Sequence, residues 1–186
     1  MKRLKSLSIL LLVWVMTACV VWEPVVYDEL EQEAVSSAIN SFKTEPRLDS
    51  FFETALAYAV FPGTYRAGAG FGAAYGQGWL FENSEVVGRA MLTELFVGAN
   101  FGAQGYRKII FFAEEWPLDQ FKRGRFEFTG QANATIATVG KNKTPSYNPG
   151  VAIFIQVKGG LIVEASVGAQ RYDFFPIPEG HAFVAD

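Results

Sequence analysis

The stretch "RAGAGFGAAYGQGWLF", residues 66–81, places five glycines at even positions: 68, 70, 72, 76 and 78. Its odd positions carry rings at Phe71, Tyr75, Trp79 and Phe81, and the remaining odd positions hold three alanines and Gln77. Side chains alternate across a β-strand, so the glycines lie on one face and the rings on the other. We expect the face with the rings to belong to the hydrophobic core.

The glycine-rich stretch is also unusually long for a strand. About 14 residues at about 3.3 Å each span about 46 Å, which is too long for one strand in a domain of this size. The sequence therefore predicts a bend near Ala73–Ala74 and two strands. Glycine weakens a strand by about 0.5–1 kcal/mol relative to alanine. Three features can compensate for this loss of strand stability: sharp barrel curvature, close approach of a helix, or close approach of a ligand.

Further strands are predicted after this stretch. They comprise the alternating residues 93–105, the doubly apolar "RKIIFFAE" (107–114), the alternating residues 126–134, and "VAIFIQV" and "LIVEASVGA" (151–157 and 161–169) around a "KGG" turn. The doubly apolar segment is typical of a central strand, and the last two form a hairpin. We predict an α+β fold with a mainly antiparallel, closed or nearly closed sheet of about seven strands, packed with two N-terminal helices and one short inserted helix.

The helices are predicted from apolar spacing and end signals. The first runs from a capping Asp28 to about Phe42, and the second from about Leu48 to Ala59 before "FPG". The third is a short helix over 117–122, with Pro117 at its start and Gly124 past its end. The apolar stripe of the second helix predicts packing on the sheet. A free amphipathic membrane helix is the alternative, although its polar face has no Lys or Arg.

The N-terminus has the pattern of an export signal. "MKRLK" is cationic, and residues 7–15 are apolar apart from Ser8, too short a run for a membrane span of about 20 residues. "MTAC" then ends in Cys19, the single cysteine, and resembles the site at which bacterial lipoproteins are cleaved and acylated. We expect a signal peptide at 1–18, a lipidated Cys19 and a tether over 19–27. The alternative is an ordinary secretory signal with an unused thiol.

Charge and composition exclude several functions. Without the three basic residues of the signal, 13 basic and 19 acidic side chains remain, a net charge near −6. The acidic excess lies in residues 19–53, and the neutral remainder lacks the broad basic face that nucleic acids require. His181 is the only histidine, so no His/Cys metal cluster is expected. The glycines match neither the dinucleotide fingerprint nor a phosphate loop.

No catalytic constellation is evident, and we expect no enzyme and no cofactor. A Ser-His-Asp arrangement would depend on His181 in the C-terminal tail. Glu114, Glu115 and Asp119 flank the start of a predicted helix, where acidic side chains are favoured for structural reasons.

Several segments together resemble the SYLF domain, a lipid-binding family. They are "ALAYAVFPGTYRAGAGFGAAYGQGWLF", "ANFGAQGYRKIIFFAEEWPLDQFKRG", "ANATIATVG" and "VKGGLIVEASVGAQ". Their order and spacing carry the resemblance, which covers residues 55–170 of a single domain over 28–186. The lysine usual after the "FP" motif is Arg66 here, which keeps the charge. The resemblance implies binding of anionic phospholipid, including headgroups of the phosphoinositide type.

The residues themselves offer candidates for a headgroup site. "FKRGRF" places Lys122, Arg123 and Arg125 between two phenylalanines, and each cation near an anionic membrane contributes about 1 kcal/mol. Arg66, Lys141 and Lys143 are weaker candidates. A solvated helix end is the alternative explanation for the basic cluster, because cations are favoured there in any case.

Two functions remain open at this point. The first is a lipid-anchored envelope protein that binds anionic phospholipid without catalysis, in the outer membrane and facing the periplasm. The second is a structural or assembly lipoprotein whose glycine-flattened surface docks a protein partner.

Overall fold

The computed structural model describes residues 29–124, 126–129, 150–157, 160–163 and 168–177. The predicted signal, tether and Cys19 lie outside these residues, as do Arg125, Lys141, Lys143 and His181. In chain order the helices are α2 (Glu29–Lys43), the 3-10 helix η1 (Pro46–Leu48), α3 (Asp49–Thr54) and α4 (Glu115–Lys122). The strands are β1 (Ala57–Glu82), β2 (Glu85–Phe112), β3 (Phe126–Thr129), β4 (Val151–Val157), β5 (Gly160–Val163) and β6 (Gly168–Pro176).

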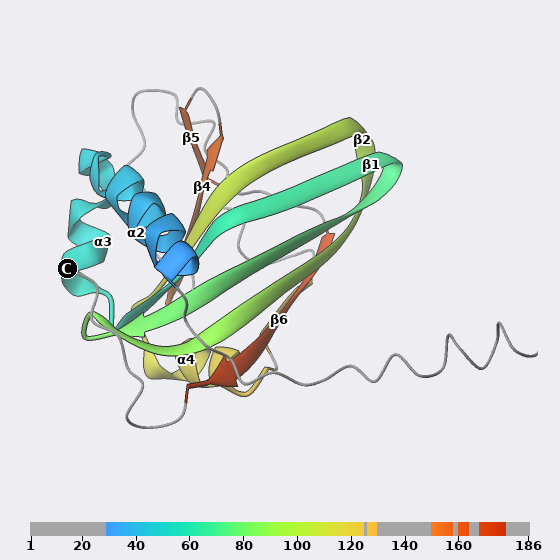
Figure 1. The fold of residues 1–186 in the computed structure, drawn as a ribbon. Coiled ribbons are helices and arrows are strands. Elements are labelled where there is room, and N and C mark those ends of the chain that lie inside the picture. Colours follow the sequence, from blue (N-terminus) through green and yellow to red (C-terminus); the bar gives the residue numbers. More distant parts are fainter. Residues whose placement is uncertain (1–28, 125, 130–149, 158–159, 164–167, 178–186) are drawn as a thin grey trace, which may run out of the picture.

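The glycine-rich stretch belongs to β1, which forms one very long antiparallel hairpin with β2. Asn83 and Ser84 make the turn, both with positive φ, as a tight hairpin turn requires. The hairpin is then bent midway along its length (Figure 1). At the bend Gly70 has φ +81°, and residues 98–100 of β2 lie opposite that single glycine. β2 therefore takes the longer, outer path around the bend, and β1 the inner one.

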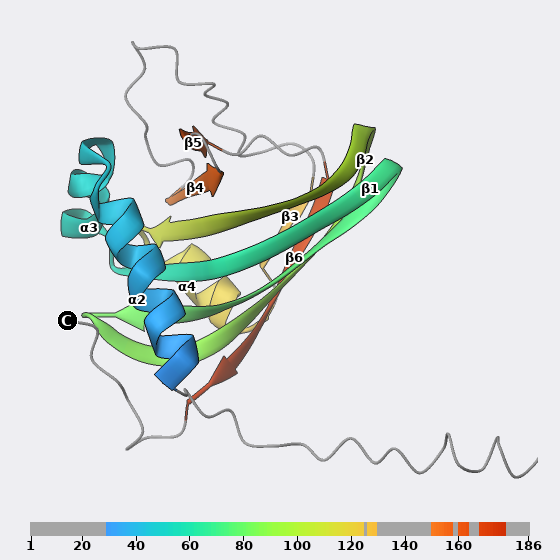
Figure 2. The same cartoon turned by 45° about the horizontal axis from the view of Figure 1, so that its top comes forward.

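The bend folds the second limb of β1 (71–82) back on the first limb (57–69), as Figure 2 shows from another angle. A Cβ at Gly72 would lie 2.4 Å from the carbonyl oxygen of Ala67, and a Cβ at Gly78 would lie 2.4 Å from that of Val60. The glycines are required because backbone of the same strand packs on them. Of the three compensating features, the described residues show curvature. The bend lies at Gly70 rather than at Ala73–Ala74, and it does not divide β1 into two strands.

The sheet is antiparallel and open. Its strands follow the order β3-β6-β2-β4-β5, and β1 pairs with β2 off this path. The predicted α+β class with an antiparallel sheet is confirmed, but the predictions of closure and of about seven strands are wrong. Several segments predicted as separate strands are parts of β1 or β2. The bend lets β2 pair with β6 along one limb and with β4 along the other, so the sheet ends in β3 and β5 instead of closing.

Helices α2 and α3 cover one face of the bent hairpin, here called the helix face. Phe81 and Trp79 are buried on it, and the Phe81 ring stacks on Tyr58 with centroids 5.1 Å apart. The buried cluster under the helices consists of Val35, Ala38, Ile39, Phe42, Leu48, Phe51, Val60, Trp79, Phe81, Val86, Ile109, Phe111, Ala152 and Phe154. Figure 1 and Figure 2 both show α2 and α3 over the end of the hairpin away from the bend.

The opposite face, here called the inner face, lies within the fold-back and is closed by α4. Phe121 of α4 packs on Phe112 and Tyr172, with ring centroids 5.1 and 5.5 Å away. α4 includes the predicted short helix, and Gly124 adopts positive φ just past its end. The second helix ends earlier than predicted, at Thr54, because the residues from Ala57 onward pair with β2 instead.

Candidate functional site

The helix face of the hairpin is uncovered near the bend. Five large apolar side chains are exposed there: Tyr65 (72%), Phe71 (76%), Tyr75 (42%), Leu95 (64%) and Val97 (79%). We call these five residues the bent-end surface. The prediction that the ring-bearing face is core is therefore correct for Trp79 and Phe81 but wrong for Phe71 and Tyr75. α2 crosses the strands near one end: Glu31 near its start contacts Arg89 of β2, and Ser41 near its end donates a hydrogen bond to Gln156 of β4. Each limb of β1 is about 40 Å long and extends beyond this crossing.

The bent-end surface is continuous across the hairpin. Phe71 lies opposite Val97 and Ala73 opposite Leu95, so these side chains are cross-strand neighbours on one face. On this face the described positions at 65–75, 91–97 and 103–105 hold no charged residue. Soluble monomeric proteins rarely expose large contiguous apolar patches, and those that do use them to bind partners or membranes.

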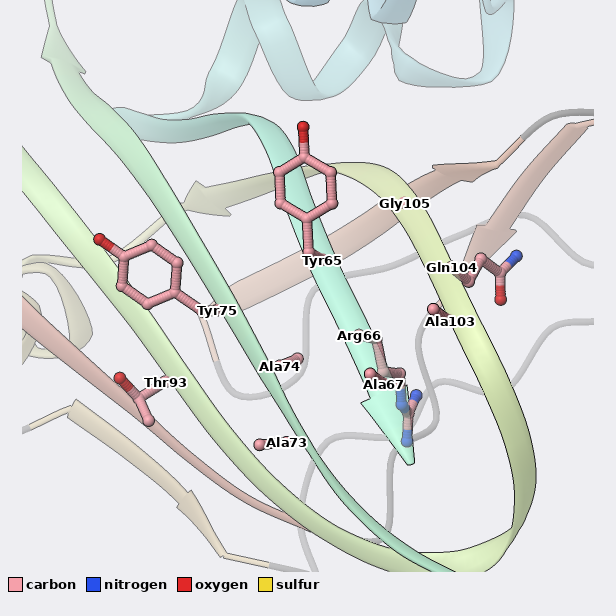
Figure 3. Close-up of a pocket in the computed structure, with 10 residues that line it drawn as sticks. All are labelled: Tyr65, Arg66, Ala67, Ala73, Ala74, Tyr75, Thr93, Ala103, Gln104 and Gly105. Atoms are coloured by element: carbon pink, nitrogen blue, oxygen red, sulfur yellow. The ribbon is translucent and has the colours of Figure 1, made fainter. Parts of the chain in front are cut away.

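A groove of about 400 Å³ opens beside the bent-end surface. It is lined by Tyr65, Arg66, Ala67, Ala73, Ala74, Tyr75, Thr93, Ala103, Gln104 and Gly105. Figure 3 shows the rings of Tyr65 and Tyr75 directed away from the guanidinium of Arg66. Four lining alanines and Gly105 carry no side-chain atom beyond Cβ, so the groove has a shallow apolar floor between two aromatic walls.

The two aromatic walls differ in their surroundings. Gln77 Nε2 donates a hydrogen bond of 2.6 Å to the Tyr75 hydroxyl, and Arg89 in turn donates to Gln77. Arg89 also lies 3.8 Å from a carboxylate oxygen of Glu31 in α2. The Tyr65 ring lies close to Gly105, where a Cβ would sit 3.8 Å from it. The Tyr75 wall is therefore held by hydrogen bonds and is connected through polar contacts to the start of α2, whereas the Tyr65 ring lies over Gly105.

The inner face carries a buried polar cluster behind the bent-end surface. Its fully or almost fully buried polar members are Thr64, Glu94, Lys108 and Gln170. Lys108 Nζ donates to Gln170 Oε1 at 3.3 Å and to the Tyr172 hydroxyl at 3.4 Å. Because Lys108 and Gln170 come from different limbs of the sheet, these contacts connect the two sides of the fold-back.

Arg66, predicted as a headgroup ligand, belongs to this inner cluster. Its terminal nitrogen lies 3.6 Å from Glu94 Oε1, and its guanidinium lies 3.7 Å from the centre of the Phe96 ring. The Glu94 side chain is fully buried, and that of Arg66 is 27% exposed. Arg66 therefore pairs with a buried carboxylate inside the fold, which is a structural role.

Replacing Arg66 with leucine is expected to lower the free energy of unfolding by about 2 kcal/mol. The variant loses the cation–π contact and the ion pair with a buried carboxylate, and partial exposure of Arg66 reduces the effect of the latter. Urea titration measures the change. Arg171→Leu is the matched control, because its pair with Asp173 (2.8 Å) is exposed and contributes less than about 1 kcal/mol. Equal losses in both variants would contradict the structural role of Arg66.

The remaining basic candidates lie elsewhere. Lys122 forms an ion pair with Glu82, and Arg123 pairs with Asp119 at 2.9 Å within α4. Across the fold-back, Arg66 lies level with Ala73–Ala74 of the second limb. From there to Glu82, the partner of Lys122, the distance along β1 is about eight residues, or about 26 Å. The structure therefore does not bring Arg66 together with Lys122, and Arg125 and Cys19 lie outside the described residues.

The resolved pKa shifts lie away from the bent-end surface. Burial raises the pKa of Tyr58 within the helix-face core. The hydrogen bond from Arg47 lowers the pKa of Glu45, and the same contact raises the pKa of Arg47. In the described part of the chain, no group of three or more His, Cys, Asp or Glu side chains has metal-binding geometry. Among the described helices, none has the length and apolar character to cross a membrane.

Comparison with known proteins gives one weak similarity. No protein-family model matches the chain. The chain is similar to Beta cell expansion factor A of Aeromonas veronii, with 23% identity over 147 residues. The match covers 75% of this chain and 53% of that protein, so the chain spans about half the length of this relative. This similarity assigns neither a family nor a site residue to the chain.

Sequence reasoning missed the bent-end surface. The alternation that marks Leu95 and Val97 as one face was visible in residues 93–105. Alternation shows which side chains share a face, but it does not show whether another element covers that face. The place where α2 and α3 stop covering the hairpin is decided by the tertiary structure.

Proposed function

We propose that this chain is a lipid-anchored envelope protein of the outer membrane whose SYLF-like domain binds anionic phospholipid without catalysis. The single observation that supports this most strongly is the bent-end surface, an exposed apolar face bearing two tyrosines and no charge at the described positions. Tyrosine suits a membrane interface because its ring is apolar and its hydroxyl is polar.

The bent-end surface supplies the apolar contribution to binding. Complete burial of a Phe, Leu or Val side chain contributes about 1.5–3 kcal/mol. Phe71, Leu95 and Val97 are each more than three-fifths exposed, so most of that contribution is available on contact with a bilayer. An acyl group on Cys19 gives a second attachment, which firm membrane binding requires.

The charge contribution is assigned to Lys122, Arg123 and Arg125. The SYLF resemblance supports anionic lipid as the preferred surface, and the Arg123 side chain is 59% exposed on α4. Each cation close to an anionic membrane contributes about 1 kcal/mol. The acidic excess of residues 19–53 opposes this attraction, so the apolar and charge contributions need separate tests.

Vesicle flotation tests the apolar contribution. The processed chain, residues 19–186 with Cys19→Ser to remove the acyl anchor, is mixed with phosphatidylcholine vesicles with or without phosphatidylglycerol. Phe71→Ser, Leu95→Ser and Val97→Ser combined are expected to weaken binding at least about tenfold, since about 1.4 kcal/mol corresponds to a factor of ten. The matched control combines Leu30→Ser, Leu56→Ser and Trp116→Ser, which remove three exposed apolar side chains elsewhere. Equal flotation of both triple variants and the parent chain would refute the assignment of this surface.

The charge contribution is tested on the same vesicles. Lys122→Glu, Arg123→Glu and Arg125→Glu combined are expected to abolish the preference for phosphatidylglycerol while leaving binding to neutral vesicles unchanged. An unchanged preference removes these residues from the proposal. If neither set of changes affects flotation but the bent-end variant loses a stoichiometric protein crosslink in membranes, the surface docks a protein instead.

A further inference from the structure

We propose that the groove between Tyr65 and Tyr75 binds a single acyl chain of a membrane lipid. This inference rests on the proposed function, since it makes the bilayer the source of the ligand. It adds a defined binding site to a surface that would otherwise only adsorb to lipid.

The lining of the groove suits a polymethylene chain. Its floor consists largely of Ala67, Ala73, Ala103 and Gly105, which present only Cα and Cβ atoms. The one charged lining residue, Arg66, directs its guanidinium toward Glu94 on the inner face, away from the two tyrosine rings (Figure 3). On this side of the strand no cation lines the groove, and Arg89 beyond Tyr75 is engaged by Gln77 and Glu31. An uncharged apolar chain needs no cation.

The backbone around the groove argues against an extended peptide as the occupant. A peptide that adds to a sheet needs a strand edge with free N–H and C=O groups. One edge of β1 pairs with β2 along the limbs, and the carbonyls of Val60 and Ala67 on the first limb are covered by Gly78 and Gly72. A ligand that forms no hydrogen bonds is therefore the better match.

The position of the groove connects it to the proposed membrane contact. Tyr65 and Tyr75 line the groove and also belong to the bent-end surface, and Ala73 of the floor lies opposite the exposed Leu95. An acyl chain leaving the leaflet that the bent-end surface contacts reaches the groove without crossing a charged lining residue other than the inward-directed Arg66. Its volume of about 400 Å³ lies within the usual range of small-ligand pockets.

The test uses the processed chain with Cys19→Ser and a fatty acid carrying an environment-sensitive fluorophore, below the concentration at which it forms micelles. The parent chain is expected to bind one equivalent saturably. Ala73→Phe and Ala103→Phe fill the groove from exposed positions, and each is expected to weaken binding about tenfold or more. Ala69→Phe is the matched control, because Ala69 is exposed on the same strand but does not line the groove.

The outcomes separate this inference from the proposed function. Absence of saturable binding, or equal weakening by Ala69→Phe, overturns the acyl-chain site even when vesicle flotation is normal. Saturable binding without vesicle flotation supports the site and refutes the proposed function. Competition by lysophosphatidylcholine but not by glycerol phosphate is expected, because the first has an acyl chain and the second only a headgroup. Competition by glycerol phosphate would overturn the inference. Thermal melting of each variant confirms that it is folded.

Discussion

Replacement of Phe81 by alanine is expected to lower the free energy of unfolding by about 4 kcal/mol, the usual loss for a buried phenylalanine. Phe81 has no exposed surface, and its ring stacks on Tyr58 beneath the N-terminal helices. Removal of the ring leaves a cavity between β1 and the helices that a rigid sheet fills poorly. Chemical denaturation of the parent and variant measures the difference.

Phe71→Ala is the matched control for this experiment. It is the same substitution on the same face of the same strand, ten residues away, but its ring is 76% exposed beyond the helices. Its expected effect on the free energy of unfolding is within about 0.5 kcal/mol. A loss at Phe71 comparable with that at Phe81 would mean that the bent-end surface is buried in the folded protein, which would remove the basis of the proposed membrane contact.

Gly78→Ala is expected to lower the free energy of unfolding by about 3 kcal/mol, at the upper end of overpacking effects. The added Cβ would lie 2.4 Å from the Val60 carbonyl oxygen and 2.6 Å from the Phe61 ring. Neither is the far end of a flexible side chain, so relief requires the two limbs of β1 to separate. Denaturant titration measures the effect, and a lower midpoint without a change of slope is expected.

Two other glycines provide a graded comparison. At Gly76 the new Cβ would meet the hydroxyl of Thr64 at 2.7 Å, and rotation of that side chain reduces the expected loss to about 1 kcal/mol. At Gly105 the nearest atom is 3.8 Å away, so alanine is expected to be neutral or to stabilise by up to about 1 kcal/mol. The same effect at all three positions would contradict the fold-back of β1 on itself.

The comparison of sequence and structure shows which patterns are informative. The doubly apolar segment "RKIIFFAE" predicts a central strand, and residues 108–112 do pair with both β1 and β4. The hairpin around "KGG" is confirmed by the pairing of Val157 with Gly160. Both predictions succeeded because the local sequence is sufficient for them. A strand buried on two faces is a continuous apolar run, and a tight turn contains glycine.

The incorrect predictions share a different cause. Apolar spacing continues past Thr54 and predicts a second helix to Ala59, but pairing with β2 outweighs helix propensity from Ala57 onward. Closure of the sheet was expected from the number of apparent strands, yet several of those segments join into β1 and β2. The headgroup role of Arg66 comes from its place after the "FP" motif and stays a prediction; local sequence does not show that the fold-back places Glu94 and Phe96 beside it.

The sequence by itself determined the α+β class, the antiparallel pairing and the separation of glycines and rings onto opposite faces of β1. These follow from local periodicity and turn chemistry, which act over a few residues. Only the tertiary structure decided that the glycine face packs on its own strand and that the ring face is covered at Phe81 but exposed at Phe71. The reason is geometric: α2 crosses the strands near one end of limbs about 40 Å long, so the bent end lies beyond it, and no local pattern records where the cover ends.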